Sequence, residues 1–241
     1  MSSNPDHGIN WLRLAAEVCA IVFSILLAFA LEAWWDARAE ARSERIVLMT
    51  LAKELDAADA QLQLQLSNYV FLEKATEAVA DQLVAAGAGQ AIAVPDAYLA
   101  ALLLDMTYDP PMGTTNTLLA SGQVFMLRNR ELGLALTEWP AAIQDAVEEQ
   151  TALWRLGDER LEPLLHQAIL NLAPVYQILT EWEQRRPLVA EESGESSVVS
   201  SPQLWNILYQ RLTFLKGGRN ELQVAGERLK RMIAVVRQEL D

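Results

Sequence analysis

The chain has 241 residues, of which 51% are hydrophobic and 21% are charged, and its formal net charge at pH 7 is -13. The apolar content excludes a wholly disordered protein. The acidic balance argues against a nucleic-acid partner, because binding phosphates needs a basic surface. The lone cysteine, Cys19, allows no internal disulfide bond.

The first predicted element is an apolar run from Leu14 to Leu31, interrupted only by Glu17, Cys19 and Ser24. A helix of this length spans about 27 Å, close to the hydrocarbon thickness of a bilayer. We therefore predict a transmembrane helix over residues 11–35, after an N-terminal tail of residues 1–10, with the lipid bilayer as a partner. Tryptophan is favoured at membrane surfaces, and the predicted interfacial anchors are Trp11, Trp34 and Trp35.

A signal peptide is the alternative interpretation of this run, since Ala28-Phe29-Ala30 offers a small-x-small cleavage pattern. Three features favour a retained anchor instead. Little positive charge precedes the run, the carboxylate of Glu17 interrupts it, and the helical pattern continues beyond Ala30.

Polar and small residues mark two features of the predicted membrane helix. Glu17 is costly inside a bilayer, and Arg13 precedes it by one helical turn, so we expect the two to pair near the headgroups. A polar contact with another helix is the alternative for Glu17.

Small residues also recur every four positions and predict a face on which two membrane helices pack closely, although alanine is common in such helices in general. The residues of this face are Ala16, Ala20, Ser24 and Ala28.

Residues 36–241 are predicted to form a helical extramembrane domain. Apolar residues continue at helical spacing from Leu48 to Leu83, with no proline or glycine among them. The membrane helix is therefore expected to continue to Ala86, where Gly87 and Gly89 end it. Two shorter helices follow, one opening at Val94-Pro95-Asp96 and ending near Met106 and one over Asn116–Ser121, with a turn at residues 108–113 between them. A further helical stretch starts at Arg130, is capped by Asn129 and runs to about Leu172. Pro140 and Pro163 are expected to kink or break it.

The C-terminal part of the chain is predicted to contain a polar loop, residues 185–201, followed by more helix. Ser201-Pro202 restart the helix, Gly217-Gly218 break or bend it, and Asn220 caps a final segment. That segment and the first helix each have one apolar face, so we expect them to pack antiparallel. No run alternates clearly enough to predict a strand. The expected fold class is all-α, with one N-terminal transmembrane helix continuing into a long amphipathic helix that packs into an extramembrane helical bundle.

Two segments resemble an uncharacterised family of bacterial single-span membrane proteins. In residues 17–38 a carboxylate opens the apolar run, an Ile-Leu-Leu-Ala centre follows, and a charged helix containing tryptophan leads out. Residues 114–132 are similar to a central segment of that family, with a small residue and glycine followed by apolar residues, Asn and Leu. The resemblance implies an N-terminal anchor in the bacterial inner membrane and a helical soluble domain, and it implies no activity. Relatives with longer, more basic N-terminal tails differ from this chain.

The segment from Tyr108 to Asn129 is the candidate interaction loop, because it mixes aromatic, methionine and polar side chains between helices. Such residues either bind a partner or lock neighbouring helices together, and both interpretations stay open. The residues proposed for this loop are Tyr108, Met112, Asn116, Phe125 and Arg128.

No catalytic, cofactor-binding or metal-ligating set is predicted. His7 and His166 have no second histidine or cysteine at metal-ligand spacing, and no phosphate-binding glycine loop or serine elbow is present. The adjacent pairs Glu148-Glu149 and Glu191-Glu192 are expected to be solvated.

We therefore expect a non-enzymatic, membrane-anchored scaffold or accessory subunit without a cofactor, which acts by self-association or by association with a membrane complex. A ligand-binding sensory domain without a recognisable output module is the alternative. Arg38, Arg42 and Arg45 after the span outnumber Arg13 before it, which favours a cytoplasmic domain. The basic tails of the resembling family favour the opposite orientation, and we expect a periplasmic domain.

Overall fold

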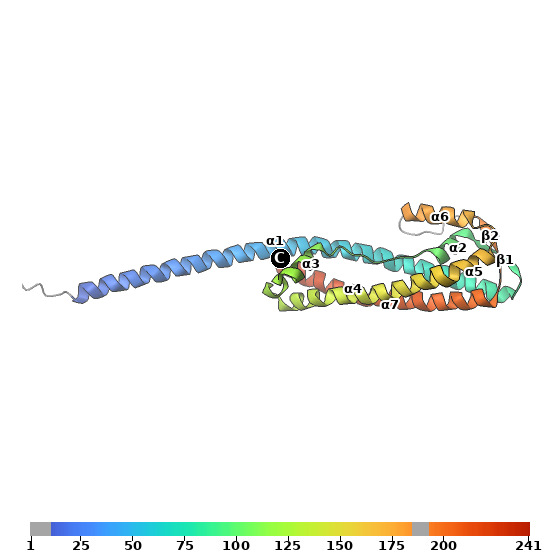
Figure 1. Ribbon diagram of the computed structural model, residues 1–241. Helices are drawn as coiled ribbons and strands as arrows, with labels where there is room; N and C mark the ends of the chain where they lie inside the picture. The colour runs from blue at the N-terminus through green and yellow to red at the C-terminus, as the bar shows by residue number, and fades with distance from the viewer. Residues whose placement is uncertain (1–10, 185–192) are drawn as a thin grey trace, which may run out of the picture. The chain divides into compact units, whose positions relative to one another are not determined.

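The computed structural model describes residues 11–184 and 193–241, so the predicted tail and residues 185–192 lie outside the described part. Within that part the chain is mostly helical, with a single two-stranded sheet, which confirms the all-α class (Figure 1). The chain divides into two compact units, Met1–Met49 and Thr50–Asp241. The elements are α1 (Trp11–Ala86), β1 (Ala91–Pro95), α2 (Asp96–Leu103), α3 (Gly113–Ser121), the 3₁₀ turn η1 (Gln123–Met126), α4 (Arg130–Leu156), the π turn η2 (Gly157–Leu161), α5 (Glu162–Ala168), α6 (Ala173–Gln184), β2 (Glu195–Val199) and α7 (Pro202–Leu240).

The first unit contains the N-terminal part of α1. By length and composition this helix is apolar enough to cross a membrane, and none of its most apolar stretch is buried within the structure. The rings of Trp34 and Trp35 meet edge to face, with centroids 5.4 Å apart. The guanidinium of Arg38 lies 5.6 Å from the centre of the Trp34 ring, a cation–π distance.

The second unit contains an antiparallel contact between α7 and the part of α1 after Thr50. Both helices bury residues at intervals of three, four or seven, which places those residues on one face. The buried apolar residues include Leu51, Leu55, Leu62, Leu72, Val79 and Leu83 of α1, and Leu215, Leu222, Leu229, Met232 and Val236 of α7.

Polar pairs between the two helices show the register of this contact. Arg237 Nη2 lies 2.8 Å from Asp56 Oδ1 near one end, and Tyr209 donates to Asp81 over 3.0 Å near the other. Because residue numbers rise along α1 as they fall along α7, the two helices run in opposite directions. Figure 1 also shows α4 beside α7, and these two helices are in contact.

The sequence predicts a break or bend at Gly217-Gly218, but α7 continues through both glycines, and Asn220 lies inside the helix instead of capping it. A Cβ atom placed on Gly218 would lie 3.0 Å from the hydroxyl oxygen of Tyr69. The glycine is therefore explained by the close approach of the Tyr69 ring, and packing outweighs its low helix propensity.

Strand β2 corrects the prediction that residues 185–201 are a loop and that the chain contains no strand. It pairs antiparallel with β1, with Ala91 opposite Val199 and Pro95 opposite Glu195. Ser200 extends the ladder, because its N–H donates to the Gln90 carbonyl over 2.8 Å. Serines weaken the strand signal of β2, and its partner is far away in the sequence, so no local pattern reveals the pair.

Several predicted boundaries are confirmed. Helix α1 ends at Ala86, and Gly87 and Gly89 follow with φ of 86° and 79°, a region that favours glycine. Asn129 and Ser201 cap α4 and α7 through their side-chain oxygens. Pro140 does not interrupt α4, whereas Pro163 lies in the first turn of α5, directly after η2. The helical stretch expected to reach Leu172 ends at Ala168.

We predict that Leu62→Ala lowers the free energy of unfolding by about 2–5 kcal/mol, because it opens a cavity in a fully buried site. Denaturant unfolding of the purified full chain in detergent measures this. Val70 lies exposed on the same helix, so Val70→Ala should change the same quantity by less than about 0.5 kcal/mol. Equal effects of the two substitutions would show that Leu62 is not a core residue.

Candidate functional site

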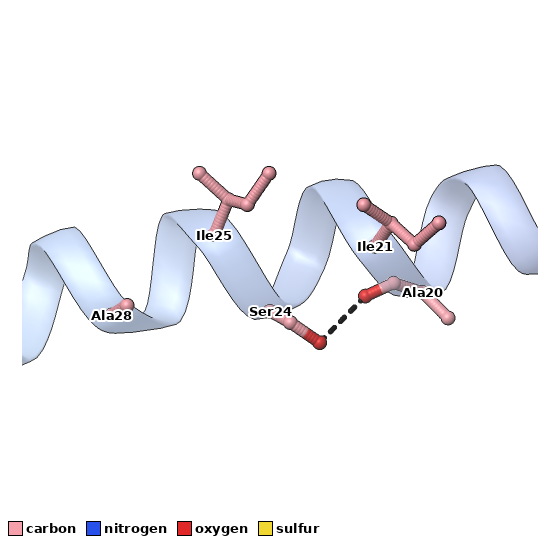
Figure 2. A pocket seen from close by; sticks show the side chains of 5 residues that line it. All are labelled: Ala20, Ile21, Ser24, Ile25 and Ala28. Atoms are coloured by element: carbon pink, nitrogen blue, oxygen red, sulfur yellow. Dashed lines mark hydrogen bonds between the residues drawn. The ribbon is translucent and has the colours of Figure 1, made fainter.

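The small-residue face predicted on the membrane helix lies exposed on α1. Ala20, Ser24 and Ala28 line a shallow groove together with Ile21 and Ile25 (Figure 2). The Ser24 hydroxyl donates to the Ala20 carbonyl over 2.8 Å, so the polar group is satisfied within its own helix. The side chain of Ala16 lies outside the described part. The groove is therefore lined by small and branched apolar groups that present no unpaired hydroxyl.

The polar and aromatic anchors of this helix are described only in part. Glu17 is exposed, as are Trp34 and Trp35. The side chains of Arg13 and Trp11 lie outside the described part, so the Arg13–Glu17 pair and the Trp11 anchor stay predictions.

The candidate interaction loop divides into a buried part and an exposed part. Tyr108 is buried, its hydroxyl donates to the Ala58 carbonyl over 3.2 Å, and its N–H donates to Gln150 Oε1 over 3.0 Å. Burial raises the pKa of the Tyr108 hydroxyl. Tyr108 therefore locks the loop to α1 and α4 and presents nothing to a partner.

A carboxylate of α1 also fixes the start of α3. Both oxygens of Glu54 accept from this helix end, one from the Thr114 N–H and the other from the N–H and hydroxyl of Thr115. These N–H groups have no partner inside a helix, so Glu54 satisfies them and complements the helix dipole. Met112, which precedes α3 in the sequence, is half-buried, and Asn116 of α3 is exposed.

The exposed part of the loop is the 3₁₀ turn η1. Phe125 and Met126 are 79% and 82% exposed, and Arg128 beside them is also exposed. Val124 is buried, and a Cβ atom on Gly133 would lie 2.8 Å from its carbonyl oxygen, so the turn packs tightly on α4. A rigid turn that holds two large apolar side chains in solvent is a candidate contact surface.

A buried arginine forms a second centre, which the sequence reasoning missed. Arg211 of α7 is fully buried, and its Nη2 donates to the carbonyls of Ala101 and Leu104 over 3.3 and 3.0 Å. These carbonyls lie at the C-terminal end of α2, where the helix dipole favours a cation. Burial lowers the pKa of Arg211 to about 10, partly offset by the charge of Asp105, so the guanidinium stays protonated at neutral pH. Its Nε and Nη1 have no hydrogen-bond partner among the described residues.

Asp105 supplies the negative charge beside this arginine. A Cβ atom on Gly157 would lie 3.5 Å from Asp105 Oδ1 and 3.6 Å from Arg211 Nη1, so the π turn η2 passes directly against both groups. Burial raises the pKa of Asp105 from 3.8 to about 6. Arg211 opposes this shift, and the charges of Asp158 and Glu162 add to it. The pKa of Asp105 is therefore raised by its surroundings at Arg211 and η2, although the residue as a whole is exposed at the surface.

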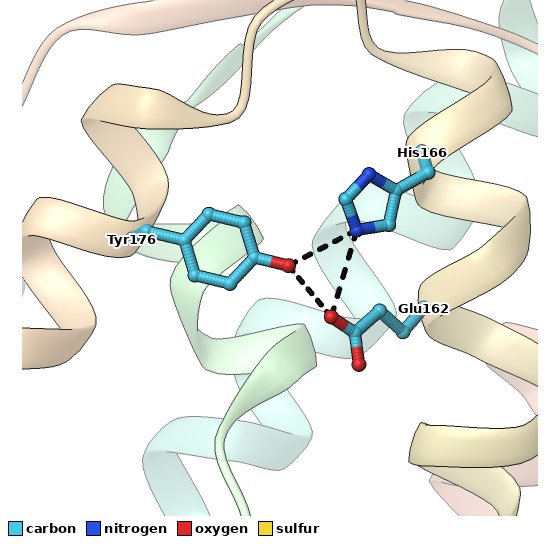
Figure 3. A network of polar contacts seen from close by, with 3 residues as sticks. All are labelled: Glu162, His166 and Tyr176. Atoms are coloured by element: carbon cyan, nitrogen blue, oxygen red, sulfur yellow. Dashed lines mark hydrogen bonds and ion pairs between the residues drawn. The ribbon is translucent and has the colours of Figure 1, made fainter.

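Glu162, His166 and Tyr176 form an exposed polar cluster between α5 and α6 (Figure 3). The Tyr176 hydroxyl donates to Glu162 Oε1 over 2.6 Å, and His166 Nε2 lies 3.1 Å from the hydroxyl and 3.6 Å from Oε1. Burial and the contact with Glu162 raise the pKa of Tyr176 to about 12. The hydroxyl stays protonated at neutral pH and is a poor nucleophile, so this cluster is best explained as a link between the two helices.

A pocket lies where α2, the α5–α6 connection and the start of β2 meet. Its lining includes the buried carboxylate of Asp96 and serines of β2. No group of three or more His, Cys, Asp and Glu side chains within residues 11–184 and 193–241 is arranged to hold a metal ion.

Comparison of the chain with known protein families, with curated proteins and with solved structures returns no match. The family resemblance therefore rests on the two sequence segments alone.

We predict that Asp105→Asn removes a pH dependence of folding. Because the pKa of Asp105 is raised in the folded protein, the folded state binds a proton that the unfolded state releases between about pH 4 and pH 6. The contribution of this group to stability is fully present below the unfolded pKa of 3.8 and is lost as the pH rises through about 6.

Urea unfolding of both proteins at pH 7, 6 and 5 tests this prediction. The wild type should gain stability relative to Asp105→Asn as the pH falls across this range. A constant difference between the two proteins would contradict the raised pKa.

Proposed function

We propose that the chain is a single-pass membrane protein without catalytic activity, whose helical domain acts by association with a second copy or with a membrane complex. The observation that carries the proposal is the exposed apolar surface of α1. Large apolar side chains cover this part of the helix, and the structure buries none of its most apolar stretch. Those side chains include Ile21, Phe23, Leu26, Phe29 and Leu31.

Exposing these apolar side chains to water costs free energy, whereas the hydrocarbon core of a bilayer accommodates them. Exposed apolar patches of such size mark membrane or partner contacts, and one helix of about 20 apolar residues spans the hydrocarbon core. The paired rings of Trp34 and Trp35, with Arg38 against one of them, suit the headgroup level that follows the apolar stretch.

Two surfaces support association as the mode of action. The groove formed by Ala20, Ser24 and Ala28 offers a small-residue face, and small faces let membrane helices pack closely. In the second unit, Phe125 and Met126 stand in solvent on a turn that is fixed to α4. A partner that covers these two side chains would gain apolar burial without having to order the turn.

A ligand-binding sensory domain is the second candidate function. The pocket beside Asp96 favours it, because a buried carboxylate in a concave site is a feature of ligand recognition.

We predict that the double substitution Ala20→Leu/Ser24→Leu weakens self-association at least several-fold while membrane insertion is retained. Leucine separates the helix backbones but suits lipid at least as well as alanine or serine does. A membrane two-hybrid assay measures association, and alkaline carbonate extraction of the same cells measures insertion.

The matched control is Val22→Leu/Ala30→Leu, which adds bulk to other faces of the same helix and should leave the two-hybrid signal unchanged. Equal loss in both double variants would show that the effect is not specific to the small-residue face. A strictly monomeric wild type would exclude self-association and leave association with another membrane protein.

We also predict that the domain faces the periplasm. Alkaline phosphatase fused after Asp241 should then be active, and a fluorescent protein fused at the same position should stay dark. Fluorescent cells without phosphatase activity would place the domain in the cytoplasm. Release of the domain from membranes by carbonate would show that the apolar segment is not a retained anchor.

A further inference from the structure

The pocket beside Asp96 is built by three separate parts of the second unit. Helix α2 contributes Asp96 at its first position, the α5–α6 connection contributes apolar and amide groups, and the start of β2 contributes hydroxyl groups and backbone. The lining residues are Asp96, Ile169, Leu170, Asn171, Pro174 and Gly194 to Ser197.

The Asp96 carboxylate is not needed to satisfy the first two N–H groups of α2. The first N–H groups of α2 are already satisfied, since Asp96 donates to the Gly194 carbonyl over 2.8 Å and Ala97 donates to Ser193 Oγ over 3.1 Å. Asp96 is only 4% exposed, and its Oδ1 has no hydrogen-bond partner among the described residues. A buried carboxylate oxygen without a donor is costly, and a charged donor compensates best for that cost.

The packing around the carboxylate is also close. A Cβ atom placed on Gly194 would lie 2.9 Å from Asp96 Oδ2, so any residue larger than glycine would press on the carboxylate. Gly194 therefore leaves room for the Asp96 carboxylate, and its carbonyl accepts the hydrogen bond that anchors the Asp96 backbone.

The chemistry of the lining indicates the kind of ligand. Among the described residues, the lining contains two carboxylates, Asp96 and Glu195, and neither lysine nor arginine. It also contains Ile169, Pro174 and the fully exposed Leu170, whose side chain has no cover within the described structure. A bare metal ion would not use these apolar groups, whereas an organic cation uses both parts of the site.

We propose that this pocket binds a small primary amine, with the ammonium group donating to the Asp96 carboxylate and the short alkyl chain lying against Leu170 and Pro174. The proposal rests on the second candidate function, whose ligand it names, and its test does not depend on self-association of α1.

Ligand-observed NMR titration of the detergent-solubilised full chain tests the proposal, with n-butylammonium chloride as the probe. Butylammonium should show saturable saturation transfer, and n-butanol, which has the same carbon chain without the charge, should bind about ten-fold more weakly or worse, as expected for the loss of a charged hydrogen bond. Butyrate should not bind. Equal binding of the alcohol and the amine would overturn the ammonium contact. Displacement of the amine by micromolar calcium would assign the site to a metal ion instead.

Variants separate the carboxylate from general effects. Asp96→Asn should weaken butylammonium binding about ten-fold or more, and Asp109→Asn, which changes an exposed carboxylate outside the pocket, should leave it unchanged. Leu170→Ser changes a fully exposed side chain and should weaken binding several-fold without affecting the fold, so it keeps the test valid if Asp96→Asn is unstable. Binding that is unchanged in both Asp96→Asn and Leu170→Ser, or absent in the wild type, would overturn the proposal.

Discussion

The second unit depends on the antiparallel contact between α7 and the part of α1 after Thr50. The contact combines close approach with charge. Gly218 and Gly226 of α7 admit the side chains of Tyr69 and Leu62, because a Cβ atom on either glycine would lie within 3.0 Å of them. Two ion pairs join the same two helices, Arg237 with Asp56 and Arg219 with Glu73, each over 2.8 Å.

Charge also enters the interior of this unit, at Arg211. The energy cost of burying the guanidinium is offset in part by the carbonyl groups at the end of α2 and by the charge of Asp105, while Nε and Nη1 have no hydrogen-bond partner among the described residues. The end of α2 is therefore held to α7 by electrostatics instead of by apolar packing alone. The π turn η2 passes against Asp105 and Arg211, and π turns within helices are frequent at functional sites.

The features predicted correctly from the sequence are those set by neighbouring residues. Asn129 caps a helix because its side chain reaches an N–H three residues later, and that interaction needs no tertiary contact. The predictions of a loop at β2 and of a break at Gly218 were wrong, because these features depend on residues far away in the sequence. Strand β2 pairs with β1, and Gly218 makes room for Tyr69. Arg211 could have been noticed, since it occupies a position on the apolar face of α7 between Leu208 and Leu215.

The candidate sites show the same limit. The small-residue face and the exposed aromatic of the interaction loop were visible as spacing and composition. Tyr108 was predicted in the same loop but is buried. Its hydrogen bonds reach α1 and α4, and no local sequence pattern reveals contacts with residues so far away in the chain. The pocket at Asp96 was not predicted, since it joins three segments that no local pattern connects.

The pairing of the first helix with the last has a consequence for synthesis of the protein on the ribosome. The apolar N-terminal part of α1 would emerge first, but the core face of the same helix, including Leu51 and Leu83, waits for α7 at the end of the chain. Strand β1 waits in the same way for β2. Contacts of such long range form late in folding. The nascent chain therefore has an uncovered apolar stripe on α1 until translation is nearly complete, and exposed apolar surface of this kind is prone to aggregation.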